Sequence, residues 1–229
     1  MPDSSPSLPP GRPWPAAVLF DMDGTLVDSE PLWTVAETEV SASFGVEFTP
    51  AMKAAVVGKR LGEASELLVA SAGIDVDPAV FAARLLDRIV QLFRVDLALR
   101  PGAVELLAQL RVAGVPLALV SSSYRVLVDA ALESVGADIF ATTLAGDEVV
   151  EAKPHPEPYL TAAARLGVDP RDCVVVEDSP AGVASGQAAG CVVVAVPEVV
   201  PIPPAPRRLV LPGLTALRWE DLEPLRHQE

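Results

Sequence analysis

Cysteine, basic residues and long hydrophobic runs are all scarce in this chain of 229 residues. Lysine and arginine together number 17 against 31 acidic residues, which gives a formal net charge of -14. Nucleic acid and anionic membrane surfaces both require a basic footprint, so this charge argues against either as a partner. No apolar run approaches the roughly 18 residues that a membrane-spanning helix needs. We therefore expect no nucleic acid and no membrane among the partners.

The two cysteines are too few for a disulfide framework, which is typical of proteins that work in a reducing cytoplasm. Cys173 precedes the apolar run VVVED, and Cys191 precedes the run VVVAV. Both runs have the composition of parallel strands, so the thiols lie at the strand starts, at the end opposite the acidic residues. We interpret both cysteines as buried structural residues of a cytoplasmic protein.

The first 15 residues differ in composition from the rest of the chain. The segment MPDSSPSLPPGRPWP is rich in proline, carries an acidic residue and has no apolar core, so it lacks the composition of a signal peptide. We predict a disordered, proline-rich leader over residues 1–15.

After the leader, short apolar runs alternate with helical patterns, as a parallel α/β sheet requires. Half of the residues (50%) are hydrophobic, which at this length is enough to bury a sizeable core in one or two domains. Helices are expected to begin near Ala103, Arg125, Glu157 and Ser179. The predicted strands lie at 16–20, 115–120, 174–178, 191–196 and, as an edge strand, 209–217, and a short segment ATTLAG lies at 141–146.

A helical insertion separates the first strand from the others. Apolar side chains recur at helical spacing from Trp33 to Phe44 and from Phe81 to Leu92, with several glycines and prolines between the two stripes. The sequence thus predicts a core domain built from residues 16–30 and 98–229, split by a helical domain at residues 31–97. An insertion at this point lies over the carboxyl ends of the strands.

The most informative segment is FDMDGTLVDSE, residues 20–30. Here the first strand delivers Asp21 and Asp23 onto a turn that Gly24 makes sharp. Alternate side chains of an extended segment share a face, so both carboxylates can point into one volume at the edge where open α/β sheets bind ligands. A bare Asp-x-Asp at a strand end is more often an ordinary acidic turn, but the DxDGT context favours a functional site.

A second acidic pair reaches the same edge of the sheet. Glu177 and Asp178 end the run VVVED, as Asp21 and Asp23 follow the first strand. A cluster of acids repels itself unless a cation intervenes, and hard carboxylate oxygens suit Mg2+. We predict that Asp21, Asp23, Glu177 and Asp178 hold a magnesium ion.

Four segments together resemble the ordered motifs of a known enzyme family. These segments are DMDGTLVDSE from Asp21, SSS at 121–123, KPHPEPY from Lys153 and VVVEDSPAG ending at Gly182. They are similar to the motifs of the haloacid dehalogenase-like (HAD) phosphohydrolases, most closely those of the beta-phosphoglucomutase-like, sugar-phosphatase branch. The match runs from about residue 16 to residue 196. The resemblance implies a Rossmann-like parallel-sheet core with a small inserted α-helical cap domain that closes on substrate.

The resemblance also implies roles for the first two acids. Asp21 matches the family's nucleophile, which attacks phosphorus to give an aspartyl phosphate. Asp23 matches the general acid/base, which protonates the leaving alkoxide and then activates water. Family members that release halide or cleave carbon–phosphorus bonds typically lack this second Asp, so its presence favours phosphate-ester chemistry.

Further residues are carried over from the other motifs. Ser121 matches the hydroxyl that binds the transferring phosphoryl group, and Ser122 and Ser123 could add donors. Lys153 matches the lysine that neutralises charge between nucleophile and phosphoryl group. A small polar residue at a strand end and a lysine before a proline are also common without function. His155 is interpreted as structural or exposed, because no second histidine is nearby.

The helical insertion bears on the choice of substrate. Lys59 and Arg60 occupy the position where relatives contact substrate, and either could bind a second anionic group; a solvated basic pair is an equally good interpretation. The mutase subset carries a histidine where this chain has Trp33, and an arginine where it has Leu61. Both departures favour a phosphatase over a mutase.

We therefore expect a Mg2+-dependent phosphatase that acts as a monomer on a small phosphorylated sugar or polyol. One alternative is an isomerase of the beta-phosphoglucomutase type, which would interconvert sugar phosphates without net release of phosphate. The other is a non-catalytic binding protein with the same fold, against which the complete set of acids, serine and lysine argues.

Overall fold

The computed structural model describes residues 14–226 and residue 228. The predicted leader therefore lies outside the described residues, apart from its last two. Trp14 is partly buried against the apolar core, and Pro15 is buried. The described part of the chain thus begins at Trp14, within the predicted leader. None of the described helices is long and apolar enough to cross a membrane.

The core is a parallel six-stranded sheet with the strand order β5-β4-β1-β6-β7-β8. The predicted α/β class and the predicted edge strand are both confirmed. The strands are β1 (Ala17–Phe20), β4 (Leu117–Val120), β5 (Thr142–Leu144), β6 (Cys173–Glu177), β7 (Val192–Ala195) and β8 (Arg208–Val210).

The register of the central strand explains where the acidic residues meet. Phe20, the last residue of β1, pairs with Leu119 of β4 on one side and with Val176 of β6 on the other. The residues that follow on all three strands therefore emerge at one edge of the sheet. Asp21, Ser121 and Glu177 are brought together in this way although they lie far apart in the sequence.

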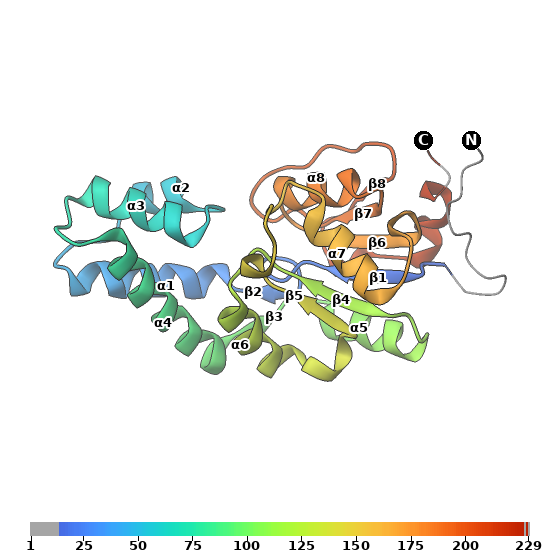
Figure 1. Ribbon diagram of the computed structural model, residues 1–229, viewed down its shortest axis with the longest axis horizontal. Helices are drawn as coiled ribbons and strands as arrows, with labels where there is room; N and C mark the ends of the chain where they lie inside the picture. Colours follow the sequence, from blue (N-terminus) through green and yellow to red (C-terminus); the bar gives the residue numbers. More distant parts are fainter. Residues whose placement is uncertain (1–13, 227, 229) are drawn as a thin grey trace.

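Helices cover both faces of the sheet and make a three-layer core (Figure 1). On one side lie α5 (Ala103–Val112) and α6 (Arg125–Val135), and on the other α7 (Glu157–Leu166) and α8 (Pro180–Ala188). Side chains of β1 alternate between the two apolar clusters, with Val18 and Phe20 in one and Ala17 and Leu19 in the other. This is the pattern of a strand that is buried on both faces.

Two signals in the sequence place the ends of these helices. Ser179 caps α8, since its hydroxyl accepts a hydrogen bond from the backbone N–H of Gly182 at 3.0 Å. Gly167 ends α7 in the left-handed conformation, with φ of 66°. Both ends agree with the prediction, because they depend on local chemistry alone.

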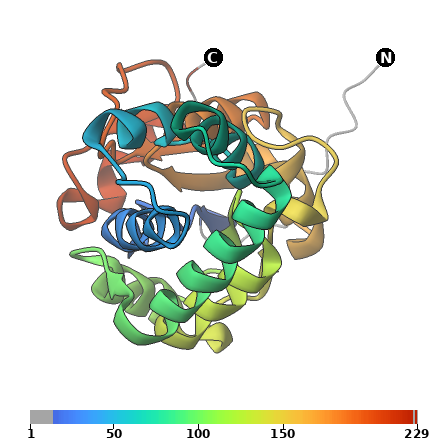
Figure 2. The same cartoon turned by 90° about the vertical axis from the view of Figure 1, so that its left-hand side faces the viewer.

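The helical insertion, α1–α4, lies beyond the ends of the strands (Figures 1 and 2). It occupies residues 30–96, close to the predicted range of 31–97. A two-stranded antiparallel ribbon, which the sequence did not predict, joins it to the core: β2 (Val27–Asp28) and β3 (Ala98–Leu99). The helices are α1 (Glu30–Ser43), α2 (Pro50–Val56), α3 (Leu61–Ala72) and α4 (Pro78–Asp96).

The apolar stripe of α4 forms the centre of this insertion. Phe81, Leu85, Ile89 and Leu92 are all buried, as their spacing predicts. Phe44 at the end of α1 stacks on Phe81 with ring centroids 5.6 Å apart. The four helices are thus held by hydrophobic packing that is continuous with the core of the sheet.

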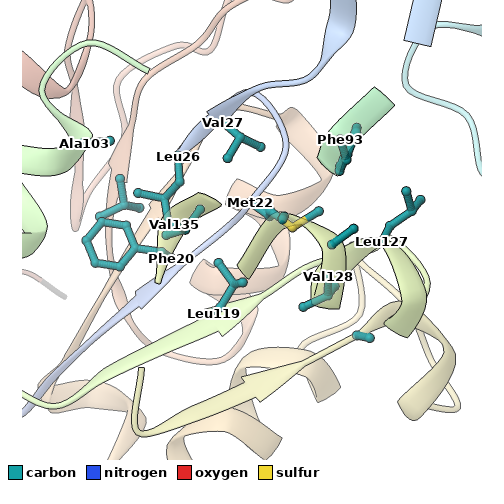
Figure 3. Packing of buried hydrophobic residues seen from close by; sticks show 14 of the residues in the cluster. Phe20, Met22, Leu26, Val27, Phe93, Ala103, Leu119, Leu127, Val128 and Val135 are labelled. Atoms are coloured by element: carbon teal, nitrogen blue, oxygen red, sulfur yellow. The ribbon is translucent and has the colours of Figure 1, made fainter. Parts of the chain in front are cut away.

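An apolar cluster lies directly beneath the first acidic motif (Figure 3). Phe20, Met22 and Leu26 are fully buried in it, beside Leu119 of β4 and Val128 of α6. Met22 stands between the two aspartates, so its burial directs the neighbouring carboxylates toward the other side of the chain. The alternation of acidic and apolar residues in this motif thus sets the direction in which the carboxylates point.

Candidate active site

Asp21 lies at the carboxyl end of the central strand and is 6% exposed. Its backbone N–H donates to the carbonyl of Val176 at 3.0 Å, which continues the β1–β6 ladder by one residue. Burial raises the pKa of its carboxyl well above the ordinary value, and the nearby Glu177 carboxylate adds to this, while Lys153 lowers it. A carboxylate in such a place needs a cationic partner to stay ionised.

Lys153 supplies that partner. Its ammonium donates to Asp21 Oδ1 at 2.6 Å, to Glu177 Oε1 at 2.7 Å and to the carbonyl of Val120 at 2.9 Å. These three bonds match the three protons of an ammonium group. Burial lowers the pKa of the Lys153 ammonium, but the two carboxylates outweigh burial and the net shift is upward. Lys153 is therefore a permanently charged group held against Asp21.

Glu177 is fully buried, and both of its carboxylate oxygens accept hydrogen bonds from protein donors. Oε1 accepts from Lys153 and, at 2.9 Å, from the hydroxyl of Tyr159. Oε2 accepts from the backbone N–H of Ser179 at 3.1 Å and from its hydroxyl at 3.0 Å. A Cβ atom on Gly182 would lie 1.6 Å from Oε1, so only glycine fits there. The carboxylate of Glu177 has one fixed orientation.

Three of the four predicted acids gather into a possible metal site. Asp21, Glu177 and Asp178 each offer an oxygen, and these atoms lie within 4.8 Å of one another. Burial, and after it the charge of Glu177, raises the pKa of Asp178 to about 7. Gly24 allows this close approach, because its φ is 77° and a Cβ there would lie 2.4 Å from Asp178 Oδ2. The donor set fits a hard cation such as Mg2+.

Asp23, the fourth predicted acid, has different neighbours. The hydroxyl of Ser29 donates to its Oδ1 at 2.7 Å, and that of Ser123 donates to its Oδ2 at 2.8 Å. Ser121 lies 3.4 Å from the same Oδ2 atom. Burial raises the pKa of Asp23, although these hydroxyl donors lower it in part. The three hydroxyls hold its side chain apart from the group of three carboxylates.

The three serines at 121–123 differ in how closely they approach Asp23. Ser121 is 3% exposed, and its Oγ accepts a hydrogen bond from the backbone N–H of Ser123 at 2.9 Å. Ser122 is exposed, and its backbone carbonyl instead lies against Gly146. Ser123 and Ser29 contact Asp23 more closely than Ser121 does. Ser29 was not predicted as a site residue; its position immediately before α1 was the available signal.

The two basic residues of the insertion lie outside this cluster. Lys59 is exposed and pairs with Glu63 of α3, with Nζ 2.5 Å from Oε1. Arg60 is also exposed and precedes the first residue of α3 without a side-chain capping bond. The structure brings neither into contact with Asp21 or Asp23. A role for either in substrate binding stays a prediction.

The remaining interpretations of single residues agree with the structure. His155 is exposed, and its Nδ1 accepts a hydrogen bond from the backbone N–H of Glu157 at 3.2 Å. Cys173 and Cys191 are both buried and free. Burial raises the pKa of Cys173 to about 12 and that of Cys191 well above its ordinary value, as is typical of structural thiols.

This arrangement can bind an anion and move a proton at one place. Lys153 offers positive charge and the serine hydroxyls offer donors, while Asp21 is a buried carboxylate and Asp23 a second acid whose pKa is raised. The class that combines these groups at the carboxyl edge of a parallel sheet is the phosphate-ester hydrolases with a Rossmann-like core. The chain belongs within that class to the haloacid dehalogenase-like hydrolases, whose family model matches residues 15–190. It is accordingly an enzyme, a phosphoric monoester hydrolase.

Three relatives illustrate the similarity. Hexitol phosphatase B of Escherichia coli (strain K12) is 34% identical over 218 residues, covering 90% of this chain and 96% of that protein. Validoxylamine A 7'-phosphate phosphatase of Streptomyces hygroscopicus subsp. limoneus is 34% identical over 212 residues, 90% and 97% of the two chains. A crystal structure from Thermotoga maritima, described as a proposed beta-phosphoglucomutase, is 31% identical with a TM-score of 0.71, covering 82% of this chain and 88% of that one.

Proposed function

We propose that this protein is a Mg2+-dependent phosphatase that hydrolyses monoesters of small sugar or polyol phosphates through an aspartyl-phosphate intermediate. The observation that carries the proposal is the bridge that Lys153 makes between Asp21 and Glu177, beside Asp178. It combines an oxygen nucleophile, a fixed positive charge and an acidic pocket for a cation at one point. The names of the phosphatase relatives support the sugar or polyol phosphate as substrate.

The first step uses Asp21 and Asp23. A carboxylate oxygen of Asp21 attacks phosphorus as the bond between phosphorus and the sugar oxygen breaks. Asp23 gives its proton to the leaving sugar oxygen, for which a raised pKa is suitable, since it keeps the acid protonated nearer to neutral pH. The products of this step are the free sugar or polyol and phosphorylated Asp21.

The second step regenerates the enzyme. Asp23, now ionised, takes a proton from a water molecule that attacks phosphorus, and the bond between phosphorus and Asp21 breaks. Inorganic phosphate leaves, and both aspartates return to their starting states. Lys153 is placed to stabilise the negative charge that the phosphoryl oxygens carry in both steps.

Asp21 and Asp178 would hold the magnesium ion, with Glu177 beside them. Within the described part of the chain, no side chain donates a hydrogen bond to Asp21 Oδ2, whereas both oxygens of Glu177 are occupied by protein donors. Bound there, Mg2+ supplies positive charge that allows an anionic phosphate to approach the acidic edge.

A mutase remains the second candidate, because the Thermotoga maritima structure is described as one. Two positions favour the phosphatase. Trp33 and Leu61, which stand where mutases carry histidine and arginine, are partly buried and pack against the apolar core. Neither offers the imidazole or guanidinium contact with which those mutases would retain and reorient a bisphosphate intermediate. We propose that the enzyme acts as a monomer on a small phosphorylated metabolite.

One assay tests the proposal against its rival. The enzyme is incubated with Mg2+ and, separately, with beta-glucose 1-phosphate and with hexose and hexitol 6-phosphates. Free phosphate and isomerised sugar phosphate are measured together. Prompt release of phosphate from a sugar or polyol phosphate is expected. Stoichiometric isomerisation with negligible release of phosphate would establish the mutase instead.

A further inference from the structure

Tyr159 is a fully buried side chain on α7 and belongs to the motif KPHPEPY. The proposed chemistry does not use it. Its hydroxyl donates to Glu177 Oε1 at 2.9 Å, the oxygen that also accepts from Lys153 at 2.7 Å. One carboxylate oxygen thus joins the tyrosine to the lysine that contacts Asp21.

The face of the Tyr159 ring touches the same lysine. Lys153 Nζ lies 5.0 Å from the ring centroid, within the range of a cation–π contact. The ammonium is therefore enclosed by the ring on one side and by its three oxygen partners on the others. With 4% of its side chain exposed, Lys153 has no solvent partner to replace a lost contact.

Oε2, the other carboxylate oxygen of Glu177, has its own donors, which are separate from Tyr159 and Lys153. Ser179 donates to Oε2 with both its backbone N–H and its hydroxyl. Gly182 closes the space behind the carboxylate, because even a Cβ atom there would overlap Oε1. Glu177 therefore cannot rotate while its four donors are in place, and Tyr159 is one of the four.

We propose that Tyr159 is a positioning residue, which acts through Glu177 to hold the Lys153 ammonium against Asp21. The inference rests on the proposed function, since it assigns Lys153 the charge-stabilising part. Without the tyrosine hydroxyl, Oε1 keeps Lys153 as its remaining side-chain donor, so the contact between Oε1 and the ammonium can shift by the small movement that the two Ser179 bonds at Oε2 still allow. A misplacement of about 1 Å at a reacting centre can cost up to about 10²-fold in rate.

Tyr159→Phe removes the hydroxyl and keeps both the ring and every charge of the site. We expect kcat to fall about 10- to 100-fold while KM stays within about twofold, because the lysine acts on the developing charge. Binding of Mn2+, followed by electron paramagnetic resonance as a probe of the acidic cluster, should be unchanged. Tyr124→Phe is the matched control: this exposed tyrosine precedes α6, and its substitution should leave kcat, KM and Mn2+ binding as in the wild type.

A second pair of variants tests the hydrogen bond that the Ser179 hydroxyl donates to Oε2 of Glu177. Ser179→Ala removes the hydroxyl donor to Oε2 and should lower kcat, whereas Ser179→Thr keeps a hydroxyl and should restore most of it. Loss of the α8 cap by itself would lower stability and leave kcat and KM of the folded enzyme unchanged, so kcat is compared at a temperature where all three enzymes are folded.

The results distinguish a failure of the positioning role from a failure of the proposed function. If the wild type is active and Tyr159→Phe has wild-type kcat at temperatures where both are folded, the positioning role is wrong and the proposed function stands. A Tyr159→Phe enzyme that loses Mn2+ binding together with activity would also overturn it, because the acidic cluster itself would then have been disturbed. If the wild type releases no phosphate from any substrate, the proposed function fails first.

Discussion

Asp21 and Asp23 are two residues apart, yet their side chains have different partners. Asp21 binds an ammonium group, whereas Asp23 accepts hydrogen bonds from hydroxyls. The first environment suits a group that must be an anion, and the second suits a group that exchanges a proton. In the proposed mechanism, two neighbouring aspartates thus serve two tasks because their surroundings differ.

Substitution of each aspartate by asparagine should separate these tasks. Asp21→Asn removes the nucleophile, so turnover should fall to the limit of detection. Asp23→Asn keeps the nucleophile and loses proton transfer, which should reduce kcat by about 10²- to 10⁴-fold. Phosphate release measures both effects, and circular dichroism should show that both variants remain folded.

Asp75→Asn is the control for these variants. Asp75 is exposed in the turn between α3 and α4, so its substitution should preserve activity. Hydrolysis by Asp21→Asn at nearly the wild-type rate would contradict the proposed chemistry.

At the scale of one element, α8 contributes its first turn to the site. Gly182 lies in that turn, and the carboxylate of Glu177 fills the space that a side chain would need. The helix can approach the carboxyl end of β6 only because this position has no Cβ atom. The glycine of the motif VVVEDSPAG therefore allows α8 to lie close to the carboxyl end of β6.

Gly182→Ala should damage both stability and activity. The new methyl group would have to displace Glu177, which is buried and held by several donors, and overpacking of this kind costs about 1–3 kcal/mol. Lys153 donates a hydrogen bond to Glu177, so displacement of Glu177 would also displace the lysine. We therefore expect kcat to fall by at least about tenfold. Urea denaturation and phosphate release measure the two effects.

Gly62→Ala is the matched control on a different helix. Gly62 lies in α3 with no atom within 4 Å of a new Cβ, so alanine there should raise the free energy of unfolding by about 0.5–1 kcal/mol. Equal effects of the two substitutions would show that the contact with Glu177 is unimportant.

Across the whole molecule acidic residues outnumber basic ones, and a few of them gather at the carboxyl ends of β1 and β6. The chain carries a formal net charge of -14, and three buried or half-buried carboxylates converge on one point. Their mutual repulsion opposes folding unless protons or a cation relieve it. We therefore expect stability to depend on pH and on the proposed metal together.

The sign of the pH effect follows from Asp178. Its pKa rises from 3.8 to about 7 on folding, first through burial and then through Glu177, so the folded protein binds more protons than the unfolded chain in that range. Stability of the metal-free protein should therefore decrease as pH rises from about 4 to about 7. Thermal unfolding in chelator should give a larger difference in Tm between about pH 5 and about pH 8 for the wild type than for Asp178→Asn.

Addition of Mg2+ should reverse this trend, because a cation binds the ionised carboxylates. The rise in Tm on adding Mg2+ should be larger at about pH 8 than at about pH 5. A rise that is independent of pH, or equal in Asp178→Asn, would place the cation elsewhere.

Removal of the metal is the corresponding test of activity. Excess chelator should abolish phosphate release and Mg2+ should restore it. Calcium should restore it poorly, since its longer and looser coordination misplaces the phosphoryl group. Full activity in chelator would contradict the proposed dependence on magnesium.

The order of strands and helices could be read from the sequence. Apolar runs such as Ala17–Phe20 and Cys173–Glu177 are continuous because both faces of these strands are buried, and caps such as Ser179 act through their nearest neighbours. Such signals are local, so they survive without knowledge of the tertiary structure. The alternation of Asp21, Met22 and Asp23 likewise predicted that both carboxylates lie on one face of the segment.

Only the tertiary structure decided which acids share a partner. Lys153 and Asp21 are 132 positions apart, and Ser123 and Asp23 are 100 apart, so no local pattern shows that one acid faces an ammonium and the other a hydroxyl. Tyr159 escaped prediction for the same reason, since a buried tyrosine on the apolar face of a helix looks like ordinary core. Its contact with Glu177 exists because α7 and β6 pack together. The sequence determined where the charged groups leave the sheet, and packing between distant segments determined which of them meet.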